Sequence, residues 1–334
     1  MTDAKYDVLG IGNAIFDVLV QTDEGFLARH GMTKGGMALI DEARAAAIYR
    51  RHGPGDRDER RLRRPTPSSA SPASAPARPL SARSRTTRSA ASTPTTSAPP
   101  ASPSRPRRRQ GGPATGCCYI LVTPDGERTM NTYLGAAQDL TPADIDEAQI
   151  AASRIVYLEG YLWDPKNAKE AFVKAASIAH GAGRQVALTL SDSFCVDRYR
   201  DEFLDLMRKG TVDLVFANEA ELHSLYQTSD FEGALKQLRA DTKLGVVTRS
   251  EKGCVVAAEG RRDGRAGVPD RKLVDTTGAG DLFAAGFLFG LVRNAGYEAA
   301  GRLGALAAAE VIQHIGARPQ VSLKELAGQN GLPV

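Results

Sequence analysis

One short stretch of the chain, residues 275–281, combines a glycine-rich turn with carboxylates and reads Asp-Thr-Thr-Gly-Ala-Gly-Asp. Two glycines in three residues allow a tight turn with bare backbone N–H groups, and an apolar helical pattern starts directly afterwards. Because a helix N-terminus is positively polarised, this turn is suited to bind phosphate oxygens. Asp281 would lie beside that phosphate, where a carboxylate can accept the proton of an attacking hydroxyl group. The alternative is that Asp281 only stabilises the start of the helix.

The longer pattern at 275–287, Asp-Thr-Thr-Gly-Ala-Gly-Asp-x-Phe-x-Ala-Gly-Phe, resembles the C-terminal signature of the ribokinase-like (PfkB-type) carbohydrate kinases. The resemblance implies that Asp281 is the catalytic base and that ATP, with Mg²⁺, is the phosphoryl donor. It also implies a site for K⁺ or another monovalent cation at Asp275. The anion hole that it implies is formed by Gly278, Ala279 and Gly280.

A polar pair, Asn218 and Glu221, follows the apolar run at 213–216. The pair resembles the family's N-x-x-E motif, which implies that it organises Mg²⁺ through water. Mg²⁺ prefers a few carboxylate or amide oxygens and keeps much of its water, which suits these side chains. The same spacing is also that of a helix N-cap and its capping-box partner, so a purely structural role stays open.

Two further segments resemble parts of the family's ATP site. The stretch at 246–253 is similar to the strand and loop that contact ATP. In the family, the corner formed here by His314 to Ala317 borders the adenine and the monovalent cation. For His314, a position just before the glycine that ends a helix is an equally good interpretation. The ATP contacts implied by these segments are Thr248, Ser250, Gly253, Gly316 and Ala317.

The first glycine-rich stretch, at 10–17, does not predict a dinucleotide site. That fingerprint needs a third glycine where Ile15 stands. The stretch resembles the family's first strand, which implies that Asn13 and Asp17 bind hydroxyl groups of the substrate. A carboxylate can accept from two vicinal hydroxyls, which suits a ribose or a hexose. A polar residue at a strand edge is the alternative for Asp17.

Two segments, 127–137 and 157–162, look closer to adenosine kinases than to ribokinases. Their apolar and aromatic residues suit the face of a purine, so a nucleoside is favoured over a free sugar as phosphoryl acceptor. The expected reaction is direct in-line transfer from Mg-ATP to a primary hydroxyl, without a covalent intermediate.

Strand and helix patterns alternate along the chain, which predicts a three-layer α/β fold with a mostly parallel sheet. Strands are expected at 6–11, 154–159, 185–190, 213–216 and 244–248, with a hairpin at 253–259 and 265–275. Helices are expected at 41–50, 165–181, 197–208, 218–227, 231–240, 280–294 and 298–314, and one is expected to start at Thr141-Pro142. A small β lid, which would exclude water, is predicted from 16–21, 37–40 and 117–134.

The stretch 61–110 differs from the rest, since 11 Arg, 11 Ser, 10 Pro, 9 Ala and 6 Thr fill 47 of its 50 positions. Such a composition cannot bury enough apolar area to fold, so the segment 56–111 is expected to be disordered or non-native. A basic insertion, a tether for RNA or acidic membranes, and a compensated frameshift are the three hypotheses for it.

The frameshift hypothesis is favoured by what the segment replaces. The family's G-G-x-x-A-N substrate motif is missing, and 56–111 has about the length of the missing elements. Lys34-Gly35-Gly36 is not that motif, because a strand rather than a helix is expected after it. If the segment is genuine, the alternative function is that of a catalytically impaired relative.

The charge, the cysteines and the length of the apolar runs argue against a general nucleic-acid-binding protein, a metal-binding cysteine pair and a membrane-spanning protein. The net charge of +4 arises in 61–110, and without it 32 basic residues face 39 acidic ones, which argues against a general nucleic-acid surface. The four cysteines form no C-x-x-C pair, which indicates a reducing compartment. No apolar run is long enough for a membrane span, and no signal peptide is expected, so a cytoplasmic location is predicted.

These patterns divide the chain into four parts. The first strand, lid strands and helix are expected in 1–55, the anomalous segment in 56–111, the lid hairpin in 112–136 and the α/β kinase core in 137–334. The expected partners are ATP and a nucleoside or sugar, with no nucleic acid and no membrane. A monomer or a lid-mediated dimer is expected.

Overall fold

The computed structural model describes residues 4–13, 15–51, 112–125, 127–258, 261–266 and 273–333, of which 261–266 are described by their backbone only. The segment 56–111 lies outside the described residues, so the expectation of disorder there stays a prediction.

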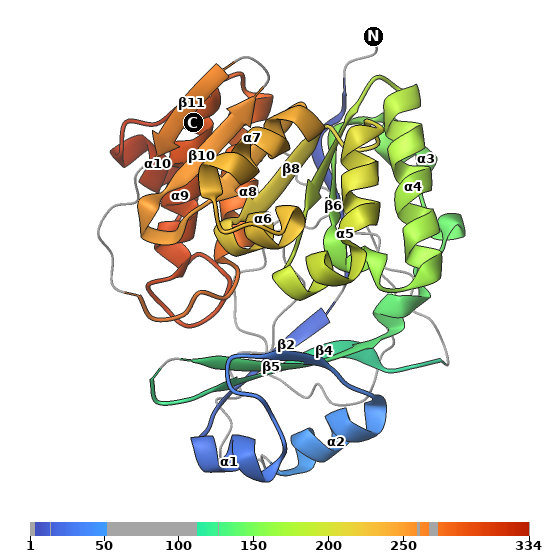
Figure 1. The fold of residues 1–334 in the computed structure, drawn as a ribbon, viewed down its shortest axis with the longest axis vertical. Helices are drawn as coiled ribbons and strands as arrows, with labels where there is room; N and C mark the ends of the chain where they lie inside the picture. Colours follow the sequence, from blue (N-terminus) through green and yellow to red (C-terminus); the bar gives the residue numbers. More distant parts are fainter. Residues whose placement is uncertain are drawn as a thin grey trace.

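The larger of the two sheets has seven strands in the order β1-β6-β7-β8-β9-β10-β11 (Figure 1). They are β1 (Tyr6–Ile11), β6 (Ser153–Glu159), β7 (Gln185–Thr189), β8 (Leu214–Asn218), β9 (Leu244–Thr248), β10 (Cys254–Ala258) and β11 (Arg261–Ala266). The strands from β1 to β9 pair in parallel, and β10 and β11 continue the sheet antiparallel. The predicted mostly parallel sheet is confirmed.

Helices cover both faces of this sheet, which gives three layers (Figure 1). One face carries α3 (Glu147–Ala151), α4 (Lys166–Gly181), α5 (Ser193–Arg208), α6 (Glu219–Tyr226) and α7 (Phe231–Asp241). The other carries α8 (Ala279–Val292) and α9 (Tyr297–Val311), with α10 (Leu323–Gln329) beside α9.

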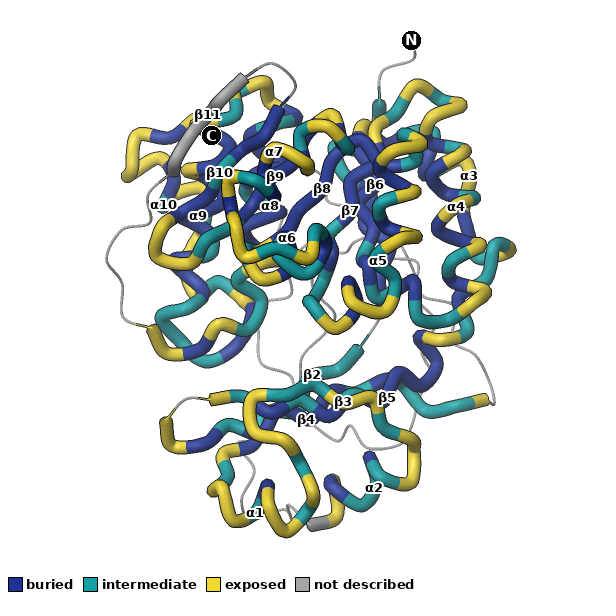
Figure 2. Tube along the Cα trace, in the orientation of Figure 1, coloured by how far each residue is buried: buried dark blue, intermediate teal, exposed yellow. Residues whose placement is uncertain are grey.

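Apolar side chains point alternately to the two faces along each strand, which explains why helices cover both faces of the sheet. In β6, Val156 and Leu158 join the apolar cluster under α4 to α7, whereas Ile155 and Tyr157 join the cluster under α8 and α9. From β6 to β10 the strands of the large sheet are therefore largely buried, while the outer faces of the helices are exposed (Figure 2).

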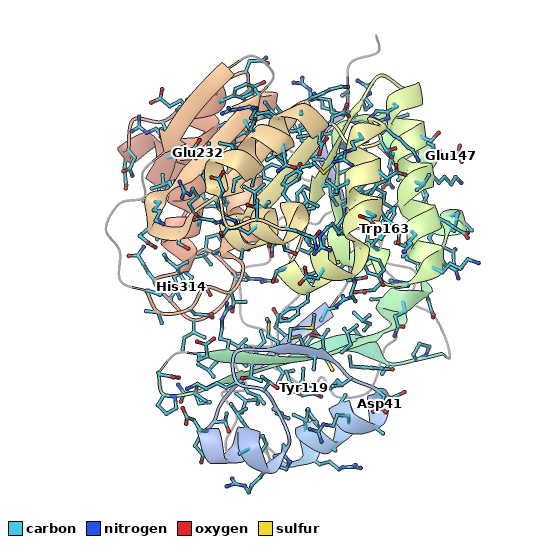
Figure 3. All side chains as sticks on the ribbon, viewed as in Figure 1. Asp41, Tyr119, Glu147, Trp163, Glu232 and His314 are labelled. Carbon is cyan, nitrogen blue, oxygen red and sulfur yellow. The ribbon has the colours of Figure 1, made fainter. Side chains whose placement is uncertain are left out.

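The smaller sheet, with its two helices, is called the lid below. Its strands run in the order β2-β4-β5-β3, with β4 and β5 antiparallel and the two edge strands parallel to their neighbours. The lid consists of β2 (Ile15–Gln21), β3 (Met37–Leu39), β4 (Thr115–Val122) and β5 (Arg128–Gly135), with α1 (Glu24–Arg29) and α2 (Glu42–Arg51). Both helices lie on the side away from the large sheet, where Tyr119 and Tyr133 pack on α2 (Figures 1 and 3). The predicted lid strands are confirmed.

Several predicted boundaries were wrong. The first turn after Thr141 is a 3₁₀ turn, Pro142–Asp144, and α3 follows it. Helix α5 starts four residues earlier than predicted, because the Asp192 side chain accepts a hydrogen bond from the Cys195 N–H and caps it there. The second hairpin strand is 261–266 and not 265–275, because its place is fixed by pairing with β10 rather than by apolar alternation.

None of the helices in the described part of the chain is long and apolar enough to cross a membrane. All four cysteines are free thiols. As expected for neighbours on a strand, Cys117 packs among the outer lid residues, while Cys118 lies on the opposite face in contact with Thr132.

Candidate active site

The predicted site residues gather where the parallel strands end. Asn13 follows β1, Asn218 ends β8, and Thr248 ends β9 in register with Asn218. Glu159 and Thr189 end β6 and β7 and are also register partners. Ligands of open α/β sheets bind outside this carboxyl edge, and here the lid faces it (Figure 1).

The glycine-rich turn forms the start of α8. Gly278 is the N-cap, with a left-handed φ of 78°, and Asp281 lies in the first helical turn. A Cβ atom on Gly278 would lie 2.2 Å from the Ala317 Cβ, so the predicted phosphate turn and the predicted adenine corner are in contact. Next to Gly280 the space is open. Of the three predicted anion-hole residues, Ala279 has its N–H donating to the Thr276 carbonyl at 3.2 Å. The anion hole at Gly278, Ala279 and Gly280 therefore stays a prediction, on a turn that brings a helix start and a carboxylate to one place.

Asp275 holds this turn together. Its Oδ1 accepts hydrogen bonds from the Thr277 N–H at 2.9 Å and the Thr277 hydroxyl at 2.6 Å. Its Oδ2 accepts from the Gly316 N–H at 2.7 Å. Both oxygens of this buried carboxylate thus have donors. The K⁺ site that the resemblance implies at Asp275 stays a prediction.

A lid residue that was not predicted, Arg128 at the start of β5, reaches the same turn. Its Nη1 donates to the Thr277 hydroxyl at 2.9 Å and lies 3.7 Å from Asp275 Oδ1. A cationic side chain therefore links the lid to the glycine-rich turn at 275–281. A single arginine in a hairpin carries no spacing pattern that would predict this contact.

Asn13 and Asp17 lie where the chain passes from the large sheet into the lid. Asn13 is buried, and its side-chain Oδ1 and Nδ2 have no hydrogen-bond partner among the described residues. Buried polar atoms normally have partners, and the role of Asn13 in binding substrate hydroxyls stays a prediction. Asp17 is in register with Cys118, on the lid face that looks away from α2.

Glu159 is the second residue that the sequence did not single out as part of the site. Its Oε2 accepts a hydrogen bond from the Asn13 N–H at 2.9 Å. Burial, with a smaller contribution from the nearby charge of Asp281, raises the pKa of Glu159 to about 8. Glu159 lies in the segment 157–162 that resembles adenosine kinases, but nothing in that segment marked this glutamate itself as a site residue.

Asn218 and Glu221 form the reciprocal capping box that was the structural alternative. The Asn218 N–H and Nδ2 donate to the two Glu221 carboxylate oxygens at 3.0 and 2.7 Å, and Glu221 N–H donates back at 2.8 Å. Burial raises the pKa of Glu221 to about 7. Because both oxygens already accept a hydrogen bond, the pair suits contact with metal-bound water better than direct coordination. The described residues contain no cluster of three or more His, Cys, Asp or Glu side chains able to hold a metal ion.

The loop after β9 makes several contacts with itself and with α6 and α7. Gly253 has a φ of 80°, and its N–H donates to the Ser250 carbonyl at 3.0 Å. Arg249 pairs with Glu219 at 2.7 Å and lies over the ring of Phe231. Thr248 is half-buried at the start of this loop. Thr248, Ser250 and Gly253 therefore lie on the same edge of the sheet as Asn218.

The corner after α9 is held by a buried pair. The His314 Nε2 lies 3.1 Å from Glu310 Oε1, and this oxygen also accepts from the Gln320 N–H at 2.8 Å. His314 lies at the end of the large domain that faces the lid (Figure 3). In this structure His314 contacts Glu310, while the neighbouring Gly316 and Ala317 contact the phosphate turn.

A pocket of about 470 Å³ lies between the lid and the large domain. From the lid it is lined by Met37, Leu39 and Leu134, and from the large domain by Gln138, Asp164, Pro165, Arg198 and Tyr199. Arg198 is held by Asp164 at 2.9 Å. The pocket thus combines an apolar lid wall with a polar and aromatic wall.

Comparison with known proteins gives this arrangement a family. The chain is 44% identical to the adenosine kinase from Sinorhizobium meliloti, whose crystal structure superimposes with a TM-score of 0.83 over 98% of this chain and 100% of that one. A probable sugar kinase from Rhizobium etli is 41% identical, with a TM-score of 0.84 over 99% and 100% of the two chains.

Similarity to curated sequences covers less of each chain. The adenosine kinase of Saccharomyces cerevisiae is 28% identical over 221 residues, which is 62% of this chain and 64% of that protein. The match thus spans less than two thirds of that relative. The model of the pfkB family carbohydrate kinases matches residues 104–323, from the lid hairpin through the Asp281 turn to α10. With its ribokinase-like α/β fold, this chain belongs to the pfkB family of carbohydrate kinases.

Proposed function

We propose that this protein transfers the γ-phosphoryl group of ATP to a primary hydroxyl group of a nucleoside, with adenosine the preferred class. The observation that carries the proposal is the start of α8, where the left-handed Gly278 turn and the Asp281 carboxylate meet at the carboxyl edge of the sheet, opposite the lid. An anion site and a base at one place are what hydroxyl phosphorylation needs.

The nucleotide would lie along the edge from β9 to α8. The constrained loop with Thr248, Ser250 and Gly253 supports the ATP contacts predicted there. The contact of Ala317 with Gly278 supports an adenosine moiety next to the phosphate turn. Mg²⁺, when bound, would neutralise charge on the phosphates, and Asn218 and Glu221 would contact its water.

In the transfer step, Asp281 would accept the proton of the attacking hydroxyl. The N–H groups of Gly278, Ala279 and Gly280 would hold the oxygens of the transferred group. Arg128 would add a positive charge from the lid, since it already contacts this turn. A lid placed over the site would exclude water and so suppress ATP hydrolysis.

The lid geometry favours a nucleoside over a free sugar. Asp17, Cys118, Thr132 and Leu39 form one register row across its four strands. At about 4.8 Å per strand, this row spans about 14 Å, which is longer than a hexose and suits a ribose with an attached base. Leu39 also lines the 470 Å³ pocket, where a base would find apolar contacts. Phe194, half-exposed one turn before Arg198 on α5, adds an aromatic surface nearby.

The test is ADP release with adenosine, inosine, ribose and fructose as acceptors. We expect the highest kcat/KM with adenosine, and a loss of about 10²–10⁴-fold in kcat for Asp281→Asn, the range for a general base. Turnover of sugars alone would contradict the nucleoside assignment. Full activity of Asp281→Asn would contradict the assignment of the base.

The segment 56–111 offers a second candidate, an impaired kinase, because it stands where the family's substrate motif is expected. Reading the coding DNA across codons 50–116 in all three frames distinguishes the two. A G-G-x-x-A-N motif in another frame would indicate a frameshift, and the restored protein should be more active. Absence of such a frame would favour a genuine insertion, and steeply salt-dependent binding of RNA would then support the tether hypothesis.

A further inference from the structure

Glu159 joins three parts of the site that are far apart in the sequence. It ends β6, its carboxyl group binds the segment after β1, and Asp281 acts on it from α8. We propose that Glu159 is a positioning residue of the phosphoryl-transfer site, whose carboxyl group fixes the Asn13 segment beside the base Asp281. This inference rests on the function proposed above.

The first argument is how Asn13 is held. Its N–H donates to Glu159 Oε2 at 2.9 Å across 146 residues of sequence, and its carbonyl accepts the Ile15 N–H at 3.0 Å. The Asn13 side chain has no partner among the described residues. Its place is therefore set through its backbone, which leaves the amide group for a substrate hydroxyl.

The second argument is the fit of the carboxyl group against the same segment. A Cβ atom on Gly12 would lie 2.3 Å from Glu159 Cδ and 2.4 Å from Oε2. The carboxyl group thus occupies the space that any side chain at position 12 would need. Only a glycine before Asn13 permits this contact.

The third argument is charge. The groups that act on the Glu159 carboxyl are Asp281 on α8 and the Asn13 N–H. Burial and then the charges of Asp281 and Glu159 raise the pKa of Tyr157, two residues earlier on β6. Burial first, and then Asp281, raises the pKa of Glu159 to about 8. The raised pKa favours the neutral, protonated form of Glu159 at neutral pH.

A protonated Glu159 matters for phosphoryl transfer. A second negative charge beside Asp281 would repel the incoming phosphate, whereas a neutral acid still accepts the Asn13 N–H and adds no charge. Ionisation of Glu159 should then lower kcat/KM as the pH rises through about 8. A glutamine at position 159 keeps the shape of the side chain and its acceptor oxygen but cannot ionise. The Glu159→Gln variant therefore distinguishes the effect of holding the Asn13 segment from the effect of ionisation.

The kinetic experiment measures kcat and KM between pH 6 and 10 for wild type, Glu159→Gln, Glu159→Ala and the control Glu298→Gln, an exposed residue on α9. We expect an alkaline decline near pH 8 in wild type and control that is absent in Glu159→Gln. Glu159→Ala should raise KM for the acceptor at least about tenfold, since it frees the Asn13 segment. A decline that persists in Glu159→Gln, or an unchanged KM in Glu159→Ala, would overturn the proposal.

A second measurement needs no substrate, so it separates this inference from the proposed activity. Because the pKa of Glu159 is raised on folding, its contribution to stability is present at low pH and is lost as the pH rises toward 8. The Tm of Glu159→Gln minus that of wild type should therefore increase between pH 5 and about 8, and then level off. A flat difference, as expected for Glu298→Gln, would overturn the protonation argument, whereas a missing kinase activity alone would leave it standing.

Discussion

At the scale of single residues, the glycine-rich turn at 275–281 is held by groups that belong to different parts of the chain. Asp275 holds Thr277 and Gly316 through both of its oxygens, and Arg128 approaches from the lid. A guanidinium group is always charged and presents several donors, so it can hold Thr277 and still contact a phosphate. The lid therefore places a positive charge against the glycine-rich turn at 275–281.

Replacement of Arg128 tests this role. Arg128→Ala should lower kcat about 10²-fold, because a positive donor near the developing phosphoryl charge is lost. Arg302→Ala, at an exposed position on α9, is the matched control and should be neutral. Steady-state kinetics at saturating ATP measure the effect, and equal kcat values for the two variants would exclude a catalytic role for Arg128.

At the scale of elements, the start of α8 shows why its glycines are not equivalent. Gly278 has a left-handed φ and lies against Ala317, whereas Gly280 lies inside the helix with open space next to it. The first glycine is needed by the backbone, since a left-handed φ and a 2.2 Å approach both exclude a side chain. The second is not needed for the conformation.

Two alanine variants separate these roles. Gly278→Ala should lower the free energy of unfolding by about 2 kcal/mol or more, because of backbone strain and overlap with Ala317. Gly280→Ala should leave stability unchanged or raise it by up to about 1 kcal/mol, since alanine favours a helix. Its kcat/KM should still fall, because the methyl group enters the proposed phosphate space. Denaturant unfolding with kinetics measures both, and equal destabilisation by the two variants would contradict this assignment.

At the scale of the whole molecule, a buried carboxylate ties several elements together at the amino ends of the parallel strands, the edge of the sheet opposite the site. The buried Asp213, just before β8, accepts hydrogen bonds from Lys243 at 2.6 Å and the Val186 N–H at 2.8 Å, and His180 lies 2.8 Å away. Burial opposes the charge, yet these three partners hold the pKa of Asp213 below its usual value. One carboxylate thus links β7, β8, β9 and α4.

The pH dependence of stability tests this link. Because its pKa is lowered on folding, Asp213 stabilises the protein above pH 4 and loses that effect as the pH falls further. The Tm of wild type minus that of Asp213→Asn should be largest near neutral pH and should shrink below about pH 4. Asp230→Asn, at an exposed position, is the control. A difference that does not vary with pH would show that Asp213 acts through shape alone.

Much of the fold could be predicted because its signals are local. Alternating strand and helix patterns predicted the parallel sheet, and the turn chemistry before α8 predicted its start to within one residue. The predicted boundaries were wrong where strand pairing or helix capping sets the end of an element, as at β11 and at the Asp192 cap of α5. The short helices α1 and α10 were not predicted, since six or seven residues show no clear period.

By itself, the sequence determined the family resemblance and the candidate motifs, because the turn at 275–281 and the pair at 218–221 are defined by short, fixed spacings. Only the tertiary structure decided that Glu159 lies against Asn13 and Arg128 against Thr277. Their contacts join residues 146 and 149 positions apart, and no local pattern records such a distance. The physical reason is that the contacts of a glutamate at a strand end and of an arginine in a hairpin depend on which distant residues the fold places next to them.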